Sequence, residues 1–181
     1  MNLLIQDLMR CMPTLPRARA EQLRGPLEAA MTESQIWAPL RAAAFLAQIG
    51  HESIDLTRWK EIGGERARYA PYYGRGPMQL TGKANYERYE AYSGIEVVDH
   101  PDLLLEDAAA IDSAIWFWST NCLNTVADRL ENELNRRATF DIISRRINGS
   151  GAPQVSLDAR WRRWVRCYEV MATPTVVTPS A

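Results

Sequence analysis

The sequence carries two glutamates, Glu52 and Glu61, whose surroundings suit them to opposite roles in acid–base chemistry. Glu52 follows an apolar stretch, where partial desolvation favours the protonated carboxyl group of a general acid. Glu61 lies nine residues later, among polar neighbours that include Arg58 and Lys60, and these favour the ionised carboxylate of a general base. One protonated and one ionised carboxyl group are what hydrolysis of a glycosidic bond requires.

The spacing of the two glutamates sets a condition on the backbone between them. On one straight helix, nine residues turn a side chain by about 180° and advance it by about 13 Å, so the two carboxyl groups would face different surfaces. We therefore predict that the helix ends near residues 53–55 and that the chain turns to bring Glu61 back. Two exposed glutamates on unrelated faces are the alternative, and Glu65 is a competitor for the base role.

A turn rich in glycine and tyrosine, residues 72–81, follows the glutamates, and we interpret it as the opposite wall of their cleft. Its glycines permit tight backbone geometry near a ligand, and it lacks the Gly-Lys-Ser/Thr ending of a phosphate-binding loop. Arg75 can pair with a carboxylate, while Gln79 and Thr81 offer groups to water or to sugar hydroxyls. The tyrosines suited either to stacking on sugar rings or to packing are Tyr69, Tyr72 and Tyr73.

Histidine and cysteine are too sparse and too scattered to indicate a metal site. His51 has only His100 as a histidine partner, and the cysteines are Cys11, Cys122 and Cys167, whereas zinc sites gather several such ligands. We expect the His51 imidazole to hold the neighbouring glutamate or a backbone carbonyl in place, and we expect no metal and no cofactor. The odd, widely spaced cysteines indicate a reducing compartment rather than a disulfide framework.

The bulk composition predicts one globular domain. The chain has 181 residues, is 46% hydrophobic and 24% charged, and carries a net charge of −1, which favours a packed core and gives no attraction to nucleic acid. We identify no signal peptide and no membrane-spanning run, so we expect synthesis in the cytoplasm. The predicted boundaries are a catalytic domain over residues 1–172 and a flexible C-terminal tail over residues 173–181.

Apolar periodicity predicts a mainly α fold with at most a short β-hairpin. Helices are expected over residues 2–12, 16–31, 39 to about 53, 83–92, 102–121 with Asp107 as a cap, 123–136, a short stretch stopped at 148–149, and 155–171. The helix from Pro39 carries a stripe of small apolar residues and should be central and buried. Residues 62–82 hold five glycines and two prolines, which favours turns and the hairpin.

The last predicted helix, residues 155–171, interleaves tryptophans with arginines. We expect Trp161 and Trp164 to face the core and the arginines to face solvent, as on an ordinary amphipathic helix. A basic amphipathic helix can also bind anionic lipid, so transient contact of this Arg/Trp helix with an outer membrane is a second hypothesis.

Four ordered blocks of sequence resemble the motifs of glycoside hydrolase family 19. They are Phe-Leu-Ala-Gln-Ile-Gly-His-Glu-Ser at residues 45–53, Tyr-Gly-Arg-Gly-Pro-Met-Gln-Leu-Thr-Gly-Lys-Ala-Asn-Tyr at 73–86, Ala-Ile-Trp-Phe-Trp at 114–118 and Arg-Ile-Asn-Gly at 146–149. The family contains chitinases and the lysozyme-like endolysins of bacteriophages and prophages, and this chain is similar to the endolysin branch. The resemblance implies a single lysozyme-like helical domain and inverting hydrolysis of β-1,4 bonds to N-acetylated amino sugars.

The resemblance also implies roles for individual residues. Glu52 matches the general acid and Glu61 the base, and Gln79, Thr81 and Asn85 match positions that bind substrate or orient the catalytic water. Asn148 matches the substrate position of the Asn-Gly motif, and Arg160 a late arginine that supports the catalytic carboxylates. With Glu52, Glu61 and Thr81 as the catalytic set, the expected substrate-binding residues are His51, Tyr73, Arg75, Gln79, Asn85, Asn148 and Arg160.

Two features depart from the family pattern. Ile54-Asp55-Leu56 replaces the usual glycine-rich continuation after the acid, and the segment between Glu61 and Tyr72 is short. From the resemblance we expect a monomeric endolysin that cleaves between N-acetylmuramic acid and N-acetylglucosamine in peptidoglycan glycan strands. It would need a holin or similar route to reach the wall. A chitinase and a non-catalytic wall-sugar-binding protein are the alternatives.

Overall fold

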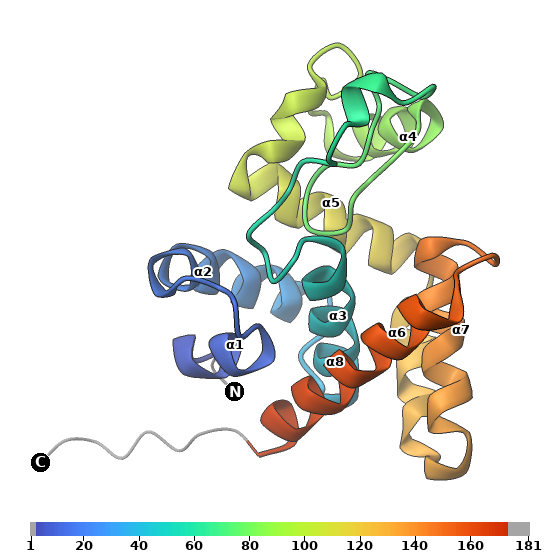
Figure 1. Cartoon of the computed structure of the whole chain (residues 1–181). Coiled ribbons are helices and arrows are strands. Elements are labelled where there is room, and N and C mark those ends of the chain that lie inside the picture. Colours follow the sequence, from blue (N-terminus) through green and yellow to red (C-terminus); the bar gives the residue numbers. More distant parts are fainter. Residues whose placement is uncertain (1–2, 174–181) are drawn as a thin grey trace, which may run out of the picture.

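The computed structural model describes residues 3–173, and over that range the chain is mainly α-helical, as predicted (Figure 1). Its α-helices are α1 (Ile5–Cys11), α2 (Arg17–Glu33), α3 (Pro39–Glu52), α4 (Lys83–Ser93), α5 (Asp107–Thr120), α6 (Leu123–Asp128), α7 (Arg136–Asn148) and α8 (Gln154–Ala172). Short 3-10 helices are η1 (Gly64–Arg66), η2 (Pro101–Leu105), η3 (Arg129–Glu131) and η4 (Glu133–Asn135). Within residues 3–173 the extended pairing is limited to isolated bridges that join Arg75 to Lys60 and to Leu80.

Helix α3 is the central element of the larger core, and α8 packs along it more extensively than any other helix does (Figure 1). Pro39 occupies its first turn, where the missing N–H of proline has no cost. Residues 42–50 of α3 are all buried, and the Phe45 ring meets Trp118 of α5 edge-on at 5.4 Å. The small residues of α3 let its neighbours approach closely, so its end is held firmly in the core.

A second, smaller core lies beside α4 and the second half of α5. It contains Leu80, Tyr86, Tyr89, Val97, Leu104 and Trp116. Helix α5 joins the two cores, since Trp118 belongs to the larger one and Trp116 to the smaller. The turn after the glutamates contributes Leu80 to the smaller core and Met78 to the larger one, to which α3 also belongs.

The helix predicted over residues 123–136 is wrong in its second half. Helix α6 stops at Asp128, and η3 and η4 intervene before α7. The carbonyl of Leu130 accepts a hydrogen bond of 2.7 Å from Arg136 Nε, and the Asn132 side chain caps the backbone N–H of Leu134 at 3.1 Å. Leu134, which fitted the apolar stripe, is 95% exposed, so the local side-chain bonds outweighed the pattern.

Two further predictions fail because of long-range contacts. Asp107 does not cap α5; its carboxylate instead binds Arg19 at 2.6 and 2.8 Å and also Gln22 on α2. On α8 the arginines do not all face solvent, because Arg160 is 1% exposed. Trp164 is buried as expected, and Trp161 stacks on it at 4.8 Å.

The structure also places two of the three cysteines together. Cys11 at the end of α1 and Cys167 on α8 are both buried, and the Cys167 thiol donates to the Cys11 carbonyl at 3.9 Å. The pKa of Cys11 is raised, first by its contact with the Cys167 thiol and then by burial. Their wide separation in the sequence gave no sign of this pairing.

In the described part of the chain, no helix is both long and apolar enough to cross a bilayer. Of the predicted tail, residues 174–181 lie outside the described residues. The predicted domain boundary at residue 172 stays a prediction.

Candidate functional site

The backbone between the two glutamates bends as predicted. Helix α3 ends at Glu52, and the next turn holds Ile54, Asp55 and Leu56 in the left-handed region, with φ of 51°, 55° and 60°. Ser53 Oγ donates to the carbonyl of Ile49 at 2.6 Å and accepts from the N–H of Leu56 at 2.8 Å. The turn reverses the chain and sends residue 61 back toward the end of α3.

Both glutamates line one cavity of about 330 Å³. Its lining is Glu52, Glu61, Tyr69, Gly74, Met78, Gln79, Leu80, Thr81, Asn85, Phe117, Ile147 and Asn148. The residues come from the end of α3, from the segment of residues 61–69, from the glycine-rich turn, and from α4, α5 and α7. Two carboxyl groups, three amide side chains and two hydroxyl groups thus face a common space in which a sugar can be bound and hydrolysed.

Glu61 is held by two donors, one on each carboxylate oxygen. The Tyr69 hydroxyl donates to Oε1 at 2.7 Å, and the N–H of Gly74 donates to Oε2 at 2.7 Å. The Glu61 N–H donates back to the Gly74 carbonyl at 2.9 Å. A Cβ at Gly74 would lie 2.8 Å from Gln79 Oε1 and 3.3 Å from Thr81 Oγ1, so a larger residue here would displace the Gln79 side chain from its present position in the cleft.

Glu52 is held from behind by a buried arginine. Arg160 Nη2 donates to Glu52 Oε1 at 2.5 Å, and Nη1 of the same guanidinium donates to Gln48 Oε1 at 2.5 Å. Gln48 in turn donates to Ser144 Oγ at 2.9 Å. The apolar setting that we expected for Glu52 is therefore incomplete, because a cation lies against one of its oxygens.

The glycine-rich turn contributes the polar groups of the opposite wall. Thr81 Oγ1 donates to the carbonyl of Gln79 at 2.8 Å, and Asn85 Nδ2 donates to the carbonyl of Thr81 at 2.9 Å. Gln79 Nε2 donates to the carbonyl of Gly76 at 3.0 Å. These bonds fix the three side chains, while the Thr81 hydroxyl keeps its lone pairs and the Asn85 carbonyl oxygen stays available to a ligand.

Tyr73 and Arg75, which we expected in the cleft, do not line it. Arg75 is 3% exposed, lies over the Tyr73 ring at 3.7 Å and pairs with Asp102 at 2.7 Å. It also donates to the Tyr86 hydroxyl at 3.0 Å. The sequence showed the residue types but not the direction of the side chains. Tyr73 and Arg75 support the turn on its side away from the cavity.

His51 lies beside the cavity lining rather than within it. Its Nε2 is 3.3 Å from Ser156 Oγ on α8, so its partner is neither Glu52 nor a backbone carbonyl. Burial, followed by the charges of Arg160 and Arg163, lowers the His51 pKa to about 4. The imidazole is therefore neutral at neutral pH.

The lowered pKa of His51 predicts an acid-sensitive fold. The unfolded chain binds the His51 proton with the ordinary pKa of 6.5, whereas the folded chain binds it only near 4. Stability is then fully present above about pH 6.5 and is lost as the pH falls toward 4. Thermal unfolding of wild type and His51→Asn between pH 8 and pH 4 checks this. We expect the wild-type Tm to fall more steeply below pH 6.5, and parallel curves would contradict it.

Glu65, the competitor for the base role, is not among the residues that line the cavity. Its carboxylate pairs with Lys60 at 2.7 Å, and that contact lowers the pKa of Glu65. The geometry therefore favours Glu61. Sequence reasoning missed the hydrogen bond of Tyr69 to Glu61 and the lining residues Phe117 and Ile147, although all three fall in or near motifs that it had singled out.

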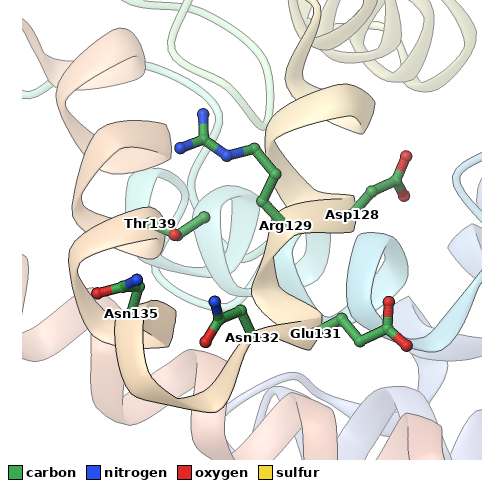
Figure 2. A pocket seen from close by; sticks show the side chains of 6 residues that line it. All are labelled: Asp128, Arg129, Glu131, Asn132, Asn135 and Thr139. Carbon is green, nitrogen blue, oxygen red and sulfur yellow. The ribbon is translucent and has the colours of Figure 1, made fainter.

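A larger cavity of about 460 Å³ lies away from the glutamates, beside α6, η3, η4 and α7 (Figure 2). It is lined by Asp128, Arg129, Glu131, Asn132, Asn135 and Thr139. Asp128 is paired with Arg41 at 2.5 Å, and Figure 2 shows Asp128 and Glu131 pointing to the side opposite Thr139 and Asn135. Its carboxylates do not converge with the amides, so the smaller cavity is the better candidate site.

Comparison with known proteins matches residues 57–150 to the family described as class I chitinases, glycoside hydrolase family 19. Among similar curated proteins, chitinase 8 of Oryza sativa subsp. japonica is 34% identical over 131 residues, which cover 59% of this chain and 49% of that protein. The acidic 26 kDa endochitinase of Solanum lycopersicum is 33% identical over 156 residues, covering 74% of this chain and 62% of the other. The chain thus spans roughly half to three fifths of these relatives.

Solved structures show the same fold. Chitinase C from Streptomyces griseus HUT6037 superposes with a TM-score of 0.73 at 23% identity, covering 98% of this chain and 79% of the other. A class IV chitinase of family 19 from Zea mays gives a TM-score of 0.64 at 22% identity, with 84% and 83% covered. The family match includes Glu61, Gln79, Thr81, Asn85 and Asn148 and begins after Glu52.

Proposed function

Because the chain belongs to glycoside hydrolase family 19, we propose that it hydrolyses β-1,4 bonds in polymers of N-acetylated amino sugars. The observation that carries the proposal is the single cavity lined by Glu52, Glu61, Gln79, Thr81 and Asn148. Such a set supplies two carboxyl groups for proton transfer and neutral polar groups for sugar and water. It also argues against a purely sugar-binding protein, which needs no paired carboxyl groups.

In the proposed mechanism Glu52 is the general acid and Glu61 the general base. Glu61, fixed by Tyr69 and Gly74, accepts a proton from a water that attacks the anomeric carbon. Glu52 gives its proton to the leaving oxygen, and Arg160 keeps the Glu52 side chain directed into the cavity. One displacement on the face opposite the leaving group inverts the anomeric centre, so the first product is the α-anomer.

We propose peptidoglycan as the polymer, with cleavage between N-acetylmuramic acid and N-acetylglucosamine. The loop that runs from Glu61 to Gly74 is short and contains only one helical turn, η1, and we infer that it leaves room on that side of the cleft. A lactyl-peptide substituent on a sugar needs such room. The biological role that fits this substrate is an endolysin that reaches the wall through a holin-type route.

Chitin is the second candidate substrate, because the relatives and the structural neighbours carry chitinase names. Release of reducing ends from purified peptidoglycan and from chitin oligomers separates the two. We expect activity on peptidoglycan and weak or no activity on chitin oligomers. The reverse result would reject the muramidase proposal, and mass spectrometry of the fragments identifies the bond that is cut.

A contribution of α8 to outer-membrane disruption is less well supported. Trp161 stacks on Trp164, Trp164 stacks on Tyr168, and the Phe140 ring packs against both tryptophans, so their rings serve packing. If α8 only packs against the core, Arg162→Gln, which neutralises an exposed arginine, leaves the lysis of intact Gram-negative cells unchanged.

Tyr69→Phe tests how the base is held. The change removes only the hydroxyl that donates to Glu61, from a side chain that is 38% exposed, so the fold should be unaffected. A hydrogen bond to a charged group contributes about 1.5–3 kcal/mol, and water replaces part of it, so we expect kcat to fall about tenfold. Tyr92→Phe, on a tyrosine that is 63% exposed on α4, is the matched control. Equal kcat values for the two variants would disprove the role of Tyr69.

A further inference from the structure

The turn that joins the two glutamates adopts a conformation that its residues do not favour. Ile54, Asp55 and Leu56 are consecutive left-handed residues, with φ of 51°, 55° and 60°. A β-branched side chain such as that of Ile54 rarely adopts this region, and such geometry persists only where surrounding structure holds it. Some contact outside the turn must therefore fix it.

The contacts that hold the turn converge on Asp55. Its side chain is buried, with 2% exposure. Oδ2 accepts hydrogen bonds from Thr14 N at 3.1 Å and from Thr14 Oγ1 at 2.6 Å. Oδ1 is paired with the Arg163 guanidinium of α8, and the Asp55 N–H donates to the carbonyl of Gly50 at 2.8 Å. Asp55 thus ties the turn to the segment before α2 and to α8 through its carboxylate, and to α3 through its backbone N–H.

Two arginines of α8, three residues apart in the sequence, bind carboxylates before and within the turn. Arg160 binds Glu52 at 2.5 Å, and Arg163 binds Asp55. Gly50 provides the space for this second pair, because a Cβ there would lie 3.3 Å from Arg163 Nη1 and 3.6 Å from Asp55 Oδ1. The same rigid helix therefore fixes the end of α3 and the start of the segment that leads to Glu61.

From these contacts we propose that Asp55 is a positioning residue that sets the placement of Glu61 relative to Glu52. The inference rests on the proposed glycosidase function and assigns Asp55 no contact with substrate. Asp55 is absent from the residues that line the cavity, so it acts only through the turn. Since a misplacement of about 1 Å in a reacting group can cost about 100-fold in rate, loosening this turn should lower kcat more than it changes KM.

Asp55→Asn is the direct test. Asp55 uses Oδ1 for Arg163 and Oδ2 for Thr14, whereas asparagine keeps a single acceptor oxygen and must give up one of the two contacts. We expect kcat to fall by about 10- to 100-fold, with KM within about twofold of wild type, at a temperature where the variant is fully folded. An unchanged kcat in the folded variant would overturn the proposal.

Asp107→Asn is the matched control for a merely structural effect. Both carboxylate oxygens of Asp107 also accept hydrogen bonds from distant residues, Arg19 and Gln22. However, Asp107 joins α2 to α5 and lies outside the cavity lining. We expect this variant to lose thermal stability and to keep its kcat. A loss of kcat equal to that of Asp55→Asn would show that general destabilisation explains both.

Thr14→Val provides a milder variant if Asp55→Asn does not fold. It removes only the hydroxyl contact to Asp55 and leaves the backbone contact from the same residue. We expect kcat to fall about three- to tenfold with KM unchanged, and a wild-type kcat would count against the proposal.

Crystal structures of Asp55→Asn, Thr14→Val and wild type give a readout that needs no substrate. We expect the Glu61 carboxylate to move by about 1 Å or more relative to Glu52 in a folded variant. If wild type were inactive on both polymers, the proposed function would fail while this displacement still decided the role of Asp55. An unmoved Glu61 would reject that role, whatever the activity.

Discussion

Glu52→Gln is expected to abolish hydrolysis of the natural polymer. The amide cannot give a proton to the leaving oxygen, and general acid catalysis contributes about 10²–10⁴-fold. A substrate with a leaving group that needs no protonation, such as a 2,4-dinitrophenyl β-glycoside of a peptidoglycan fragment, should be cleaved far better by the variant than the polymer is. The ratio of kcat/KM on the two substrates, in variant and in wild type, measures the acid role directly.

The control for this change must account for the partner of Glu52. Arg160, which is 1% exposed, would face a neutral amide in the variant, and an imperfectly paired buried group costs about 1–3 kcal/mol. Circular dichroism and thermal unfolding define a temperature at which the variant is folded. Glu131→Gln, a glutamate of the distant cavity, should behave as wild type. Full activity of Glu52→Gln on the polymer would refute the acid assignment.

Glu61→Gln is expected to lower kcat by several hundredfold or more, within the range of about 10²–10⁴ for a general base. The amide has one acceptor oxygen, so it cannot receive both Tyr69 and Gly74 and cannot take a proton from water. Unlike the acid variant, it should lose activity equally on the polymer and on the dinitrophenyl glycoside. Sodium azide, a nucleophile that needs no deprotonation, should restore turnover and give an α-glycosyl azide.

Glu65→Gln is the companion to this experiment. Glu65 has the same side chain four positions away, but it pairs with Lys60 at 2.7 Å, so we expect a kcat close to that of wild type. A larger loss for Glu65→Gln than for Glu61→Gln would transfer the base role to Glu65. A β-anomer as the first product, detected by proton NMR, would reject the inverting mechanism itself.

The sequence could predict those parts of the site whose structure depends on residues close together in the chain. Pro39 marks the start of α3, and the run of small apolar residues shows that the helix is buried. The demand that two glutamates share one cleft predicted the turn after Glu52, and that turn is present. The glycine-rich segment was correctly placed as the opposite wall, because glycine marks close backbone approach at Gly74.

The parts that could not be predicted depend on groups far apart in the chain. Asp107 has the signature of a helix cap, yet Arg19, 88 residues away, binds it. Tyr73 and Arg75 stand in the motif, but Arg75 lies over the Tyr73 ring and pairs with Asp102, 27 residues away, so neither side chain lines the cavity. In the sequence, Asp55 only marked a departure from the glycine-rich continuation of the family pattern. Its partners Thr14 and Arg163 are 41 and 108 residues away in the chain. Periodicity and capping carry no information about such partners.

The burial of Arg160 against Glu52 bears on when the enzyme can first become active. While the ribosome is still adding residues before 160, the nascent chain lacks the cation that orients the acid and the helix that covers most of α3. Translation of the catalytic glutamates therefore precedes their assembly by about 100 residues. Under the proposed function, a cell that makes the protein meets a competent catalyst only after α8 has been translated.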